Sequence, residues 1–179
     1  MSTSFLGRTS PDPDVAPISV EEYLRSSYEP DCDYVDGYLE ERNVGDWEHS
    51  KLQKKILLYL EKHYGQQPFE VMQELRIRVS ETRFRIPDLC VFPSDPKQRV
   101  PSTPPFLCIE ILSPEDRMSR LEVRINDFLA MGVAYVWVID PETRQCYSAT
   151  GAEGLREVKS GLLRTEAPAI ELPLAEIFS

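Results

Sequence analysis

The sequence predicts an α/β protein with a mixed central β-sheet flanked by helices. Two apolar runs, at 106–112 and 134–139, have the length of buried strands, and an amphipathic pattern at about 115–131 predicts a helix between them. A strand, a helix and a strand joined by short connections form a right-handed parallel crossover. Further strand-like runs before residue 92 add the remaining strands of the sheet.

The chain is expected to hold one domain behind a tail. Residues 1–17 contain three prolines and no apolar core, which indicates a disordered N-terminal tail and not a signal peptide. Residues 18–179 are long enough to bury a sizeable core and are expected to form a single domain.

Capping and turn signals place the first elements. Ser19, followed three residues later by Glu22, is a capping box that begins a short helix. Asp36-Gly37 between two short strand-like runs predicts a two-residue hairpin turn. A long helix is expected at about 47–64, with lysines on its solvent-facing side and apolar residues at helical spacing: Leu52, Ile56, Tyr59 and Leu60.

Extended segments follow at 69–72, 74–79 and 83–92. We expect the last of these to be one continuous strand that places Asp88 on the same face as its apolar neighbours. A proline-rich loop at 93–105 leads to the central apolar strand.

The second amphipathic helix is expected to bury one stripe and to stop at Gly132. The stripe comprises Met118, Leu121, Ile125, Phe128 and Leu129. The segment 144–158 has the pattern of an edge hairpin, and 173–178 that of a final helical turn.

Composition narrows the function classes. A hydrophobic fraction of 41% and a charged fraction of 28% are those of a soluble protein, and no run is long enough to span a membrane. The four cysteines are scattered without metal-ligand spacing, which indicates a reducing, cytoplasmic setting. The net charge of −10 counts against tight non-specific DNA binding, although a nuclease remains compatible with it.

Asp88 and Glu110 are the most informative residues of the sequence. Each is an isolated acid in an apolar, strand-like run, and burying a carboxylate is costly unless a cation or hydrogen-bond donors compensate. On neighbouring strands the two acids can lie side by side. Together with the backbone carbonyl of Ile111 they would hold Mg²⁺ or Mn²⁺ and leave coordination positions for water and phosphate.

Five segments together resemble the Uma2 family of restriction endonucleases, within the PD-(D/E)xK nuclease superfamily. The resemblance covers about Val20 to Tyr147 and rests on the order and spacing of the segments 33–39, His49, 85–88, 109–114 and 132–141. It implies a restriction-endonuclease-like core and a Mg²⁺-dependent phosphodiesterase site in which Asp88 and Glu110 bind the metal.

The resemblance is uneven at the other site positions. Leu112 stands where many members of the superfamily carry lysine, and the lysine that this family places on the following helix aligns with Arg124. Arg120 stands at the position of an acid, and Asp33 at that of a glutamate. Arg124 can bind phosphate, but a guanidinium cannot act as a general base, so the resemblance leaves catalytic competence open.

Structural roles compete with these functional ones. Asp88 could pair with Arg76, Arg78 or Arg124, and Arg124 could form an interior salt bridge to Glu110. His49 could be a helix-entry residue, Asp33 a surface acid beside a turn, and Trp47 and Trp137 packing residues. Four arginines could form a basic ridge that binds a phosphate backbone, or they could belong to a solvated face of the sheet: Arg76, Arg78, Arg83 and Arg85. The negative net charge favours the solvated face.

The sequence therefore predicts a metal-dependent endonuclease that acts on DNA, with Asp88, Glu110 and Arg124 as its catalytic residues, and a homodimer is compatible with cutting both strands. The alternative is an inactive nuclease fold that serves as an interaction or regulatory module. A hydrolase of another phosphoester is a third reading, since one metal site serves many phosphate substrates.

Overall fold

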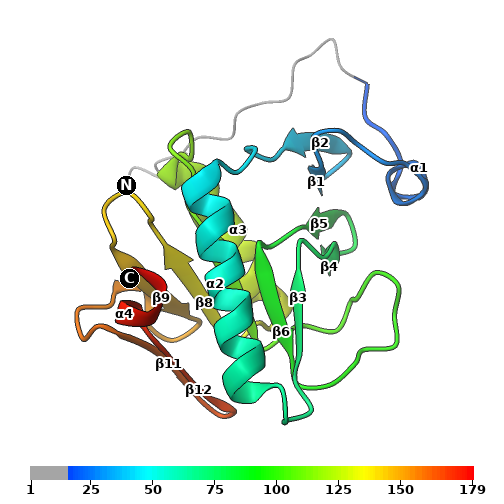
Figure 1. Ribbon diagram of the computed structural model, residues 1–179. Helices are drawn as coiled ribbons and strands as arrows, with labels where there is room; N and C mark the ends of the chain where they lie inside the picture. Colours follow the sequence, from blue (N-terminus) through cyan, green and yellow to red (C-terminus); the bar gives the residue numbers. More distant parts are fainter. Residues whose placement is uncertain (1–15) are drawn as a thin grey trace, which may run out of the picture.

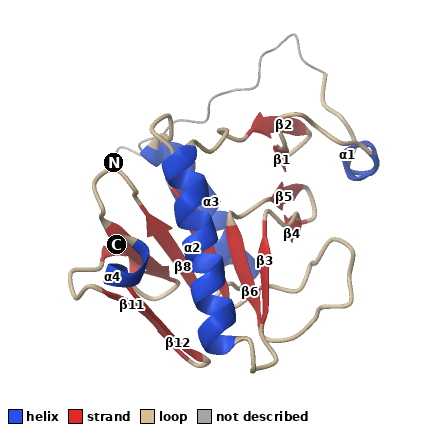
Figure 2. Cartoon of the chain, viewed as in Figure 1, coloured by secondary structure: helices blue, strands red, loops and turns tan. Residues whose placement is uncertain are grey.

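The computed structural model describes residues 16–179, and the expected tail at 1–17 falls largely outside the described residues. A six-stranded mixed sheet forms the centre, and a four-stranded antiparallel sheet lies beside it (Figures 1 and 2). The helices are α1 (Val20–Arg25), α2 (Trp47–Tyr64), α3 (Met118–Met131) and α4 (Leu174–Ile177).

The central sheet has the order β10-β9-β8-β7-β6-β3, and only β7 and β8 run parallel. Its strands are β3 (Glu70–Gln73), β6 (Leu89–Phe92), β7 (Leu107–Ile111), β8 (Tyr135–Ile139), β9 (Cys146–Thr150) and β10 (Gly154–Glu157). The parallel pair is connected through α3, which confirms the crossover that the sequence predicts. The fold is the expected mixed sheet flanked by helices.

The smaller sheet has the order β2-β1-β5-β4 and a core of Tyr23, Tyr34 and Phe84. Its strands are β1 (Cys32–Val35), β2 (Tyr38–Glu41), β4 (Ile77–Ser80) and β5 (Arg83–Arg85). Asp36 and Gly37 both have positive φ, as a two-residue hairpin turn requires, so the expected hairpin is confirmed. A separate hairpin of β11 (Leu162–Glu166) and β12 (Ala169–Pro173) was not predicted.

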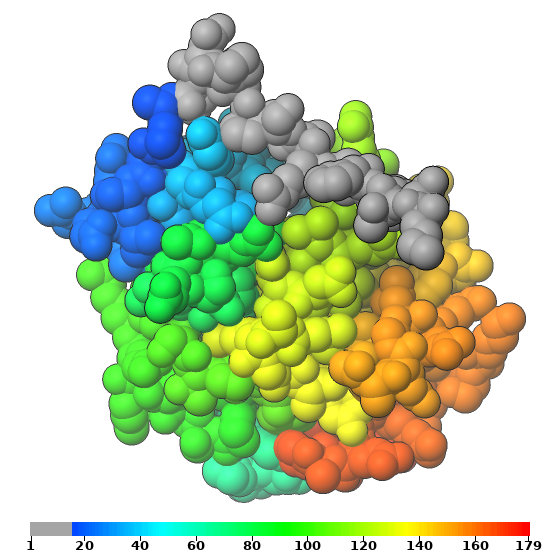
Figure 3. Space-filling model, turned by 180° about the vertical axis from the view of Figure 1, so that it is seen from behind, coloured from blue at the N-terminus to red at the C-terminus, as the bar shows by residue number. Residues whose placement is uncertain are grey.

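Each face of the central sheet is covered. Leu52, Ile56 and Leu60 of α2 pack on one face, and Leu121, Ile125 and Phe128 of α3 pack on the other. Residues of α3 occupy the middle of the surface when the molecule is seen from behind (Figure 3). Among the described residues, no helix is long and apolar enough to cross a membrane.

Several helix ends follow the local sequence. The Ser19 side chain accepts a hydrogen bond from the N–H of Glu22, which confirms the capping signal. The α2 helix runs over the predicted range, and Gly132 ends α3 in a left-handed conformation. Met118 was expected in the buried stripe of α3, but its side chain is 52% exposed because it occupies the first helical position, beyond the edge of the core.

The prediction of one continuous strand at 83–92 is wrong, because the segment is divided into two strands. The chain forms β5 in the small sheet and β6 in the central sheet, with a break at Ile86, Pro87 and Asp88. Pro87 has no N–H to donate to a ladder and restricts the residue before it, so the strand ends there. The break lets the chain cross between the sheets and places Asp88 at the start of β6.

Candidate metal centre

Asp88 and Glu110 face each other across the antiparallel pair of β6 and β7. Leu89 is the partner of Ile109, so the next position along places Asp88 opposite Glu110. The alternation of side chains puts both acids on the α3 side of the sheet, because Cys90 and Cys108 pack in the α3-side core. Both acids are buried. The structure therefore brings the two predicted acids together.

The two acids line an open cleft between the sheets and the start of α3, with an empty volume of about 620 Å³ that includes the solvent at its mouth. Its wall contains six carboxylates and three arginines, so acids outnumber cations. The charged and polar residues of the wall are Asp33, Glu40, Glu41, Arg42, Asn43, His49, Asp88, Glu110, Ser113, Asp116, Arg120 and Arg124.

Asp88 is held in its ionised form. Its Oδ1 lies 2.7 Å from Arg42 Nη2, and its Oδ2 accepts a 2.7 Å hydrogen bond from the N–H of Ile111 and lies 3.4 Å from His49 Nε2. Burial alone would raise the pKa of Asp88, but the His49 hydrogen bond, Arg42 and the Ile111 N–H together lower it. Gln53 fixes the backbone by donating to the Asp88 carbonyl at 3.0 Å.

Glu110 has a different environment. Nη2 of Arg124 lies 2.8 Å from its Oε2 and 3.0 Å from its Oε1, and it also donates to the Ile86 carbonyl at 3.2 Å. Burial raises the pKa of Glu110 to about 8; Arg124 counteracts this and the negative charge of Asp88 adds to it. A buried acid with a raised pKa beside one with a lowered pKa marks a candidate functional site.

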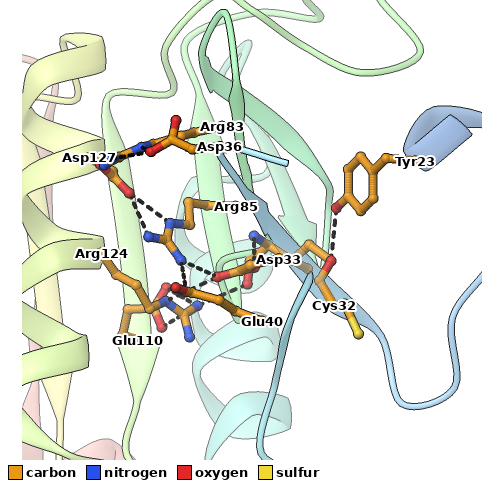
Figure 4. Close-up of polar contacts among 11 residues, drawn as sticks. Tyr23, Cys32, Asp33, Asp36, Glu40, Arg83, Arg85, Glu110, Arg124 and Asp127 are labelled. Carbon is orange, nitrogen blue, oxygen red and sulfur yellow. Dashed lines mark hydrogen bonds and ion pairs between the residues drawn. The ribbon is translucent and has the colours of Figure 1, made fainter. Parts of the chain in front are cut away.

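A network of ion pairs is centred on the buried Arg85 and includes two residues that line the cleft, Asp33 and Glu40 (Figure 4). Arg85 is fully buried and contacts Asp33 at 3.0 Å, Glu40 at 2.7 Å and Asp127 of α3 at 2.7 Å. Asp33 Oδ1 also accepts a 3.0 Å hydrogen bond from the N–H of Ile86. The interpretation of Asp33 as a surface acid is therefore wrong: it is buried and lines the cleft, because β1 is covered by its pairing with β5 and by this network.

The arginines of the small sheet do not form one ridge. Arg85 is buried, and Arg83 pairs with Asp36 and with Asp127. Arg76 lies over the Tyr23 ring, and Arg78 donates to the carbonyls of Ser80 and Glu81. The interpretation as a solvated sheet face does not describe Arg85 either, because Arg85 is fully buried and pairs with Asp33 of β1, Glu40 of β2 and Asp127 of α3.

Two other structural interpretations are resolved. Arg124 does form the interior salt bridge to Glu110 that the sequence suggested as an alternative. The arginine that pairs with Asp88 is Arg42, and not Arg76, Arg78 or Arg124. Trp137 is fully buried as expected, whereas Trp47 is 79% exposed at the start of α2, so its interpretation as a packing residue is wrong.

The loops at the cleft contain residues that the sequence did not reveal. Arg42 and Asn43 follow β2 directly, and Asn43 Nδ2 donates to Asp116 Oδ1 at 2.8 Å. Asp116 in turn accepts a 2.6 Å hydrogen bond from the N–H of Ser113, just after β7. These contacts join the loop after β2 to the loop before α3. No periodicity signals them, because all four residues lie in loops.

The donor set suits a hard divalent cation held by two protein carboxylates. Two buried carboxylates, an adjacent backbone carbonyl and an excess of acids in the wall match the preference of Mg²⁺ and Mn²⁺ for oxygen. Within residues 16–179, no group of three or more histidines, cysteines or acids is arranged to hold a metal ion, so water and substrate would complete the coordination. In the part of the chain that the structure describes, the buried Nε atoms of Arg42 and Arg124 have no hydrogen-bond partner.

Taken together, the mixed sheet and the paired acids at its edge define an α/β protein with a restriction-endonuclease-like fold. The chain belongs to the Uma2 family, whose model is described as "Putative restriction endonuclease" and matches residues 20–178. This confirms the family resemblance of the sequence and supports nuclease function.

A solved structure has the same fold. It is the crystal structure of a "putative nuclease belonging to DUF820" from Anabaena variabilis, with 22% sequence identity and a TM-score of 0.81. The match covers 90% of this chain and 98% of that chain. Among curated proteins, none matches this chain.

Proposed function

We propose that this protein is a metal-dependent endonuclease that hydrolyses phosphodiester bonds of DNA. The observation that carries the proposal is the direct opposition of Asp88 and Glu110 at one end of a cleft rich in carboxylates. Asp88, Glu110 and the carbonyl of Ile111 would hold Mg²⁺ or Mn²⁺. Such an ion polarises a phosphodiester oxygen and makes its bound water more acidic.

Arg42 and Arg124 are expected to have different partners in the metal-free and the metal-bound cleft. Without a metal ion, Arg42 pairs with Asp88 and Arg124 contacts both carboxyl oxygens of Glu110. When a divalent cation compensates the carboxylates, both guanidiniums become free to bind phosphate oxygens, to which their planar donors are suited. Arg124 lies on α3 between Glu110 and Asp33, so we assign to it the stabilisation of charge on the scissile phosphate.

The second candidate is an inactive nuclease fold that acts as an interaction or regulatory module. The arginines at positions 120 and 124 favour it, and so does the contact of each of the two acids with an arginine. Titration of the folded protein with Mn²⁺ separates the two functions: calorimetric binding that is lost in Asp88→Asn supports the nuclease, and its absence from the unaltered protein supports the module.

A plasmid-nicking assay with Mg²⁺ or Mn²⁺ tests the proposed activity. We expect the unaltered protein to nick supercoiled DNA, and Asp88→Ala and Glu110→Ala to lose this activity. Asp95→Ala is the matched control, because Asp95 is a solvent-exposed acid outside the cleft whose ion pair is with the neighbouring Lys97. Equal nicking by the unaltered protein and both cleft variants would assign the signal to a contaminant. The homodimer that would suit cutting of both strands is tested separately by light scattering.

A further inference from the structure

The three arginines of the cleft wall differ in their partners. Arg42 Nη2 lies 2.7 Å from Asp88 Oδ1. Arg124 contacts both carboxyl oxygens of Glu110. Arg120 lines the same cleft, but among the described residues its side chain has no ion pair and no hydrogen bond. Arg120 is therefore the cleft arginine that an anion can bind without displacing a carboxylate.

The fold gives Arg120 no structural role. Its side chain is exposed, so it lies outside the core. It belongs to the first turn of α3, which contains no acid and no side-chain cap. The free N–H groups of a first turn form the positive end of the helix dipole, where an acid is favourable and a cation is not. Arg120 therefore does not stabilise the helix that bears it.

The acids nearest to Arg120 in the sequence are directed elsewhere. Glu122, two residues further on, lies about 200° around the helix from Arg120. Asp116 accepts a 2.8 Å hydrogen bond from Asn43 Nδ2 through one carboxyl oxygen. Its other carboxyl oxygen accepts a 2.6 Å hydrogen bond from the N–H of Ser113. The donors of the Arg120 guanidinium are therefore available to an anion that enters the cleft.

Arg120 and Arg124 lie on the same side of α3, one turn apart. Four residues correspond to about 400° of rotation and to about 6 Å along the helix axis, so the two side chains project about 40° apart. Arg124 extends from α3 to Glu110 (Figure 4). Its side chain is 17% exposed, whereas Arg120 is exposed. Arg124 therefore occupies the inner part of the cleft and Arg120 the outer part.

We propose that Arg120 binds the phosphate next to the scissile phosphate in the same DNA strand. This inference rests on the proposed function and deepens it, because it names a second phosphate contact in the same cleft. Consecutive phosphates of one strand are about 3.4 Å apart along the axis of a duplex. Two long side chains that start about 6 Å apart on one helix can therefore reach two neighbouring phosphates. A guanidinium offers paired donors that fit two oxygens of one phosphate.

The two arginines then act at different stages of the reaction. Arg124 becomes free to bind phosphate when a divalent cation compensates Glu110, so its phosphate contact depends on the metal ion. Arg120 has no carboxylate to leave and binds the strand with or without the metal ion. Arg120 therefore strengthens the binding of substrate, whereas Arg124 stabilises the charge that develops during the chemical step.

Binding of DNA without divalent metal tests the contact directly. The affinity for a fluorescently labelled duplex of about 20 base pairs is measured by anisotropy between about 50 and 200 mM salt. We expect Arg120→Gln to weaken binding by about tenfold and to reduce the slope of log affinity against log salt by about 1. Arg120→Lys keeps the charge and should retain the slope. No binding by the unaltered protein would overturn the inference.

Arg117→Gln is the matched control for this experiment. Arg117 is an exposed arginine at the N-cap of the same helix, and it lies outside the cleft wall. Its replacement changes the net charge of the protein by the same amount as Arg120→Gln. We expect this control to retain nearly the full affinity and salt slope. Equal losses in Arg117→Gln and Arg120→Gln would assign the effect to overall charge and overturn the inference.

The kinetics of nicking separate Arg120 from Arg124. With Mn²⁺ present, we expect Arg120→Gln to raise KM by about tenfold and to leave kcat nearly unchanged, because the contact is made equally in the bound substrate and in the transition state. Arg124→Gln should instead lower kcat. A lower kcat with an unchanged KM in Arg120→Gln would contradict the assigned role.

Two small nucleotides test whether the second phosphate neighbours the first. Thymidine 3′,5′-bisphosphate has two phosphates on one nucleoside, and thymidine 5′-monophosphate has one. Their binding to the protein with Mn²⁺ is measured by calorimetry. We expect the unaltered protein to prefer the bisphosphate and Arg120→Gln to lose this preference. A preference that persists in Arg120→Gln would place the contact elsewhere and overturn the inference.

Failure of this inference can be told apart from failure of the proposed function. Duplex binding that depends on Arg120, without nicking by the unaltered protein, keeps the phosphate contact and removes the endonuclease. Nicking with an unchanged KM in Arg120→Gln keeps the endonuclease and removes the phosphate contact.

Discussion

Asp88 lies directly opposite Glu110 across β6 and β7, yet the two carboxylates have opposite electrostatic environments. Asp88 receives three donors, from Arg42, His49 and the Ile111 N–H, which lower its pKa. Glu110 has Arg124 as its cationic partner, and its burial raises its pKa. A metal cation between them would meet Asp88 already ionised at neutral pH, whereas Glu110 would release a proton when the cation binds.

Arg42 is expected to compete with a metal ion for Asp88. Its guanidinium lies 2.7 Å from Asp88 Oδ1, and a hydrogen bond between charged groups contributes about 1.5–3 kcal/mol. Arg42→Met should therefore bind Mn²⁺ about tenfold more tightly than the unaltered protein. The measurement is isothermal titration calorimetry, and the stabilisation of each protein by saturating Mn²⁺ gives a second readout. Weaker Mn²⁺ binding would show that Arg42 supports the site instead of competing for it.

Arg124→Lys is expected to increase nicking if the protein is a weakened enzyme. Lysine can transfer a proton when its pKa is lowered, which a guanidinium cannot do. Positioned proton-transfer groups contribute roughly 10²-fold or more to rate, so we expect an increase of up to about 100-fold. The rate is measured on supercoiled plasmid, with Arg156→Lys as the control at an exposed position of β10 outside the cleft. An unchanged or lower rate would favour the inactive module.

His49 should make folding stability depend on pH. Burial lowers the pKa of His49, but the hydrogen bond and charge of Asp88 outweigh it, and the net shift is upward from 6.5. The stabilisation is therefore complete below pH 6.5 and is lost as the pH rises through the higher pKa of the folded state. His49→Gln should lose more stability at pH 6 than at pH 9 in urea unfolding.

The control for this prediction is the exposed histidine of the same helix. His63 stacks on Tyr59 near the end of α2, and the structure gives it no acid partner among the described residues. His63→Gln should show no comparable difference between pH 6 and pH 9. A loss of stability in His49→Gln that is the same at both pH values would contradict the Asp88–His49 linkage.

Arg85 is expected to be essential for stability. Its side chain is fully buried, and its removal leaves Asp33 without the main cation that compensates it. Breaking a buried ion pair from one side costs about 3–5 kcal/mol, so Arg85→Met should lower the free energy of unfolding by about this amount. Lys97→Met, at a solvent-exposed ion pair, is the control and should leave the urea midpoint unchanged. Equal midpoints for the two variants would contradict the role of the network.

Much of the fold follows from local patterns in the sequence. The capping signal at Ser19, the Asp36-Gly37 turn and the apolar spacing of 47–64 each depend on neighbours within one turn or hairpin, and all three elements form as predicted. The acids at 88 and 110 could be identified because a charge inside an apolar run is costly wherever the run is buried.

Only the tertiary structure decided which cations meet those acids. Arg42 lies 46 residues before Asp88 in a loop without periodicity, and its approach depends on how the small sheet docks on the central one. The same docking buries Asp33 and Arg85, while the position of Trp47 at a helix end leaves it exposed. Sequence patterns report burial along a single element, whereas long-range ion pairs depend on the packing of elements against one another, which no local pattern encodes.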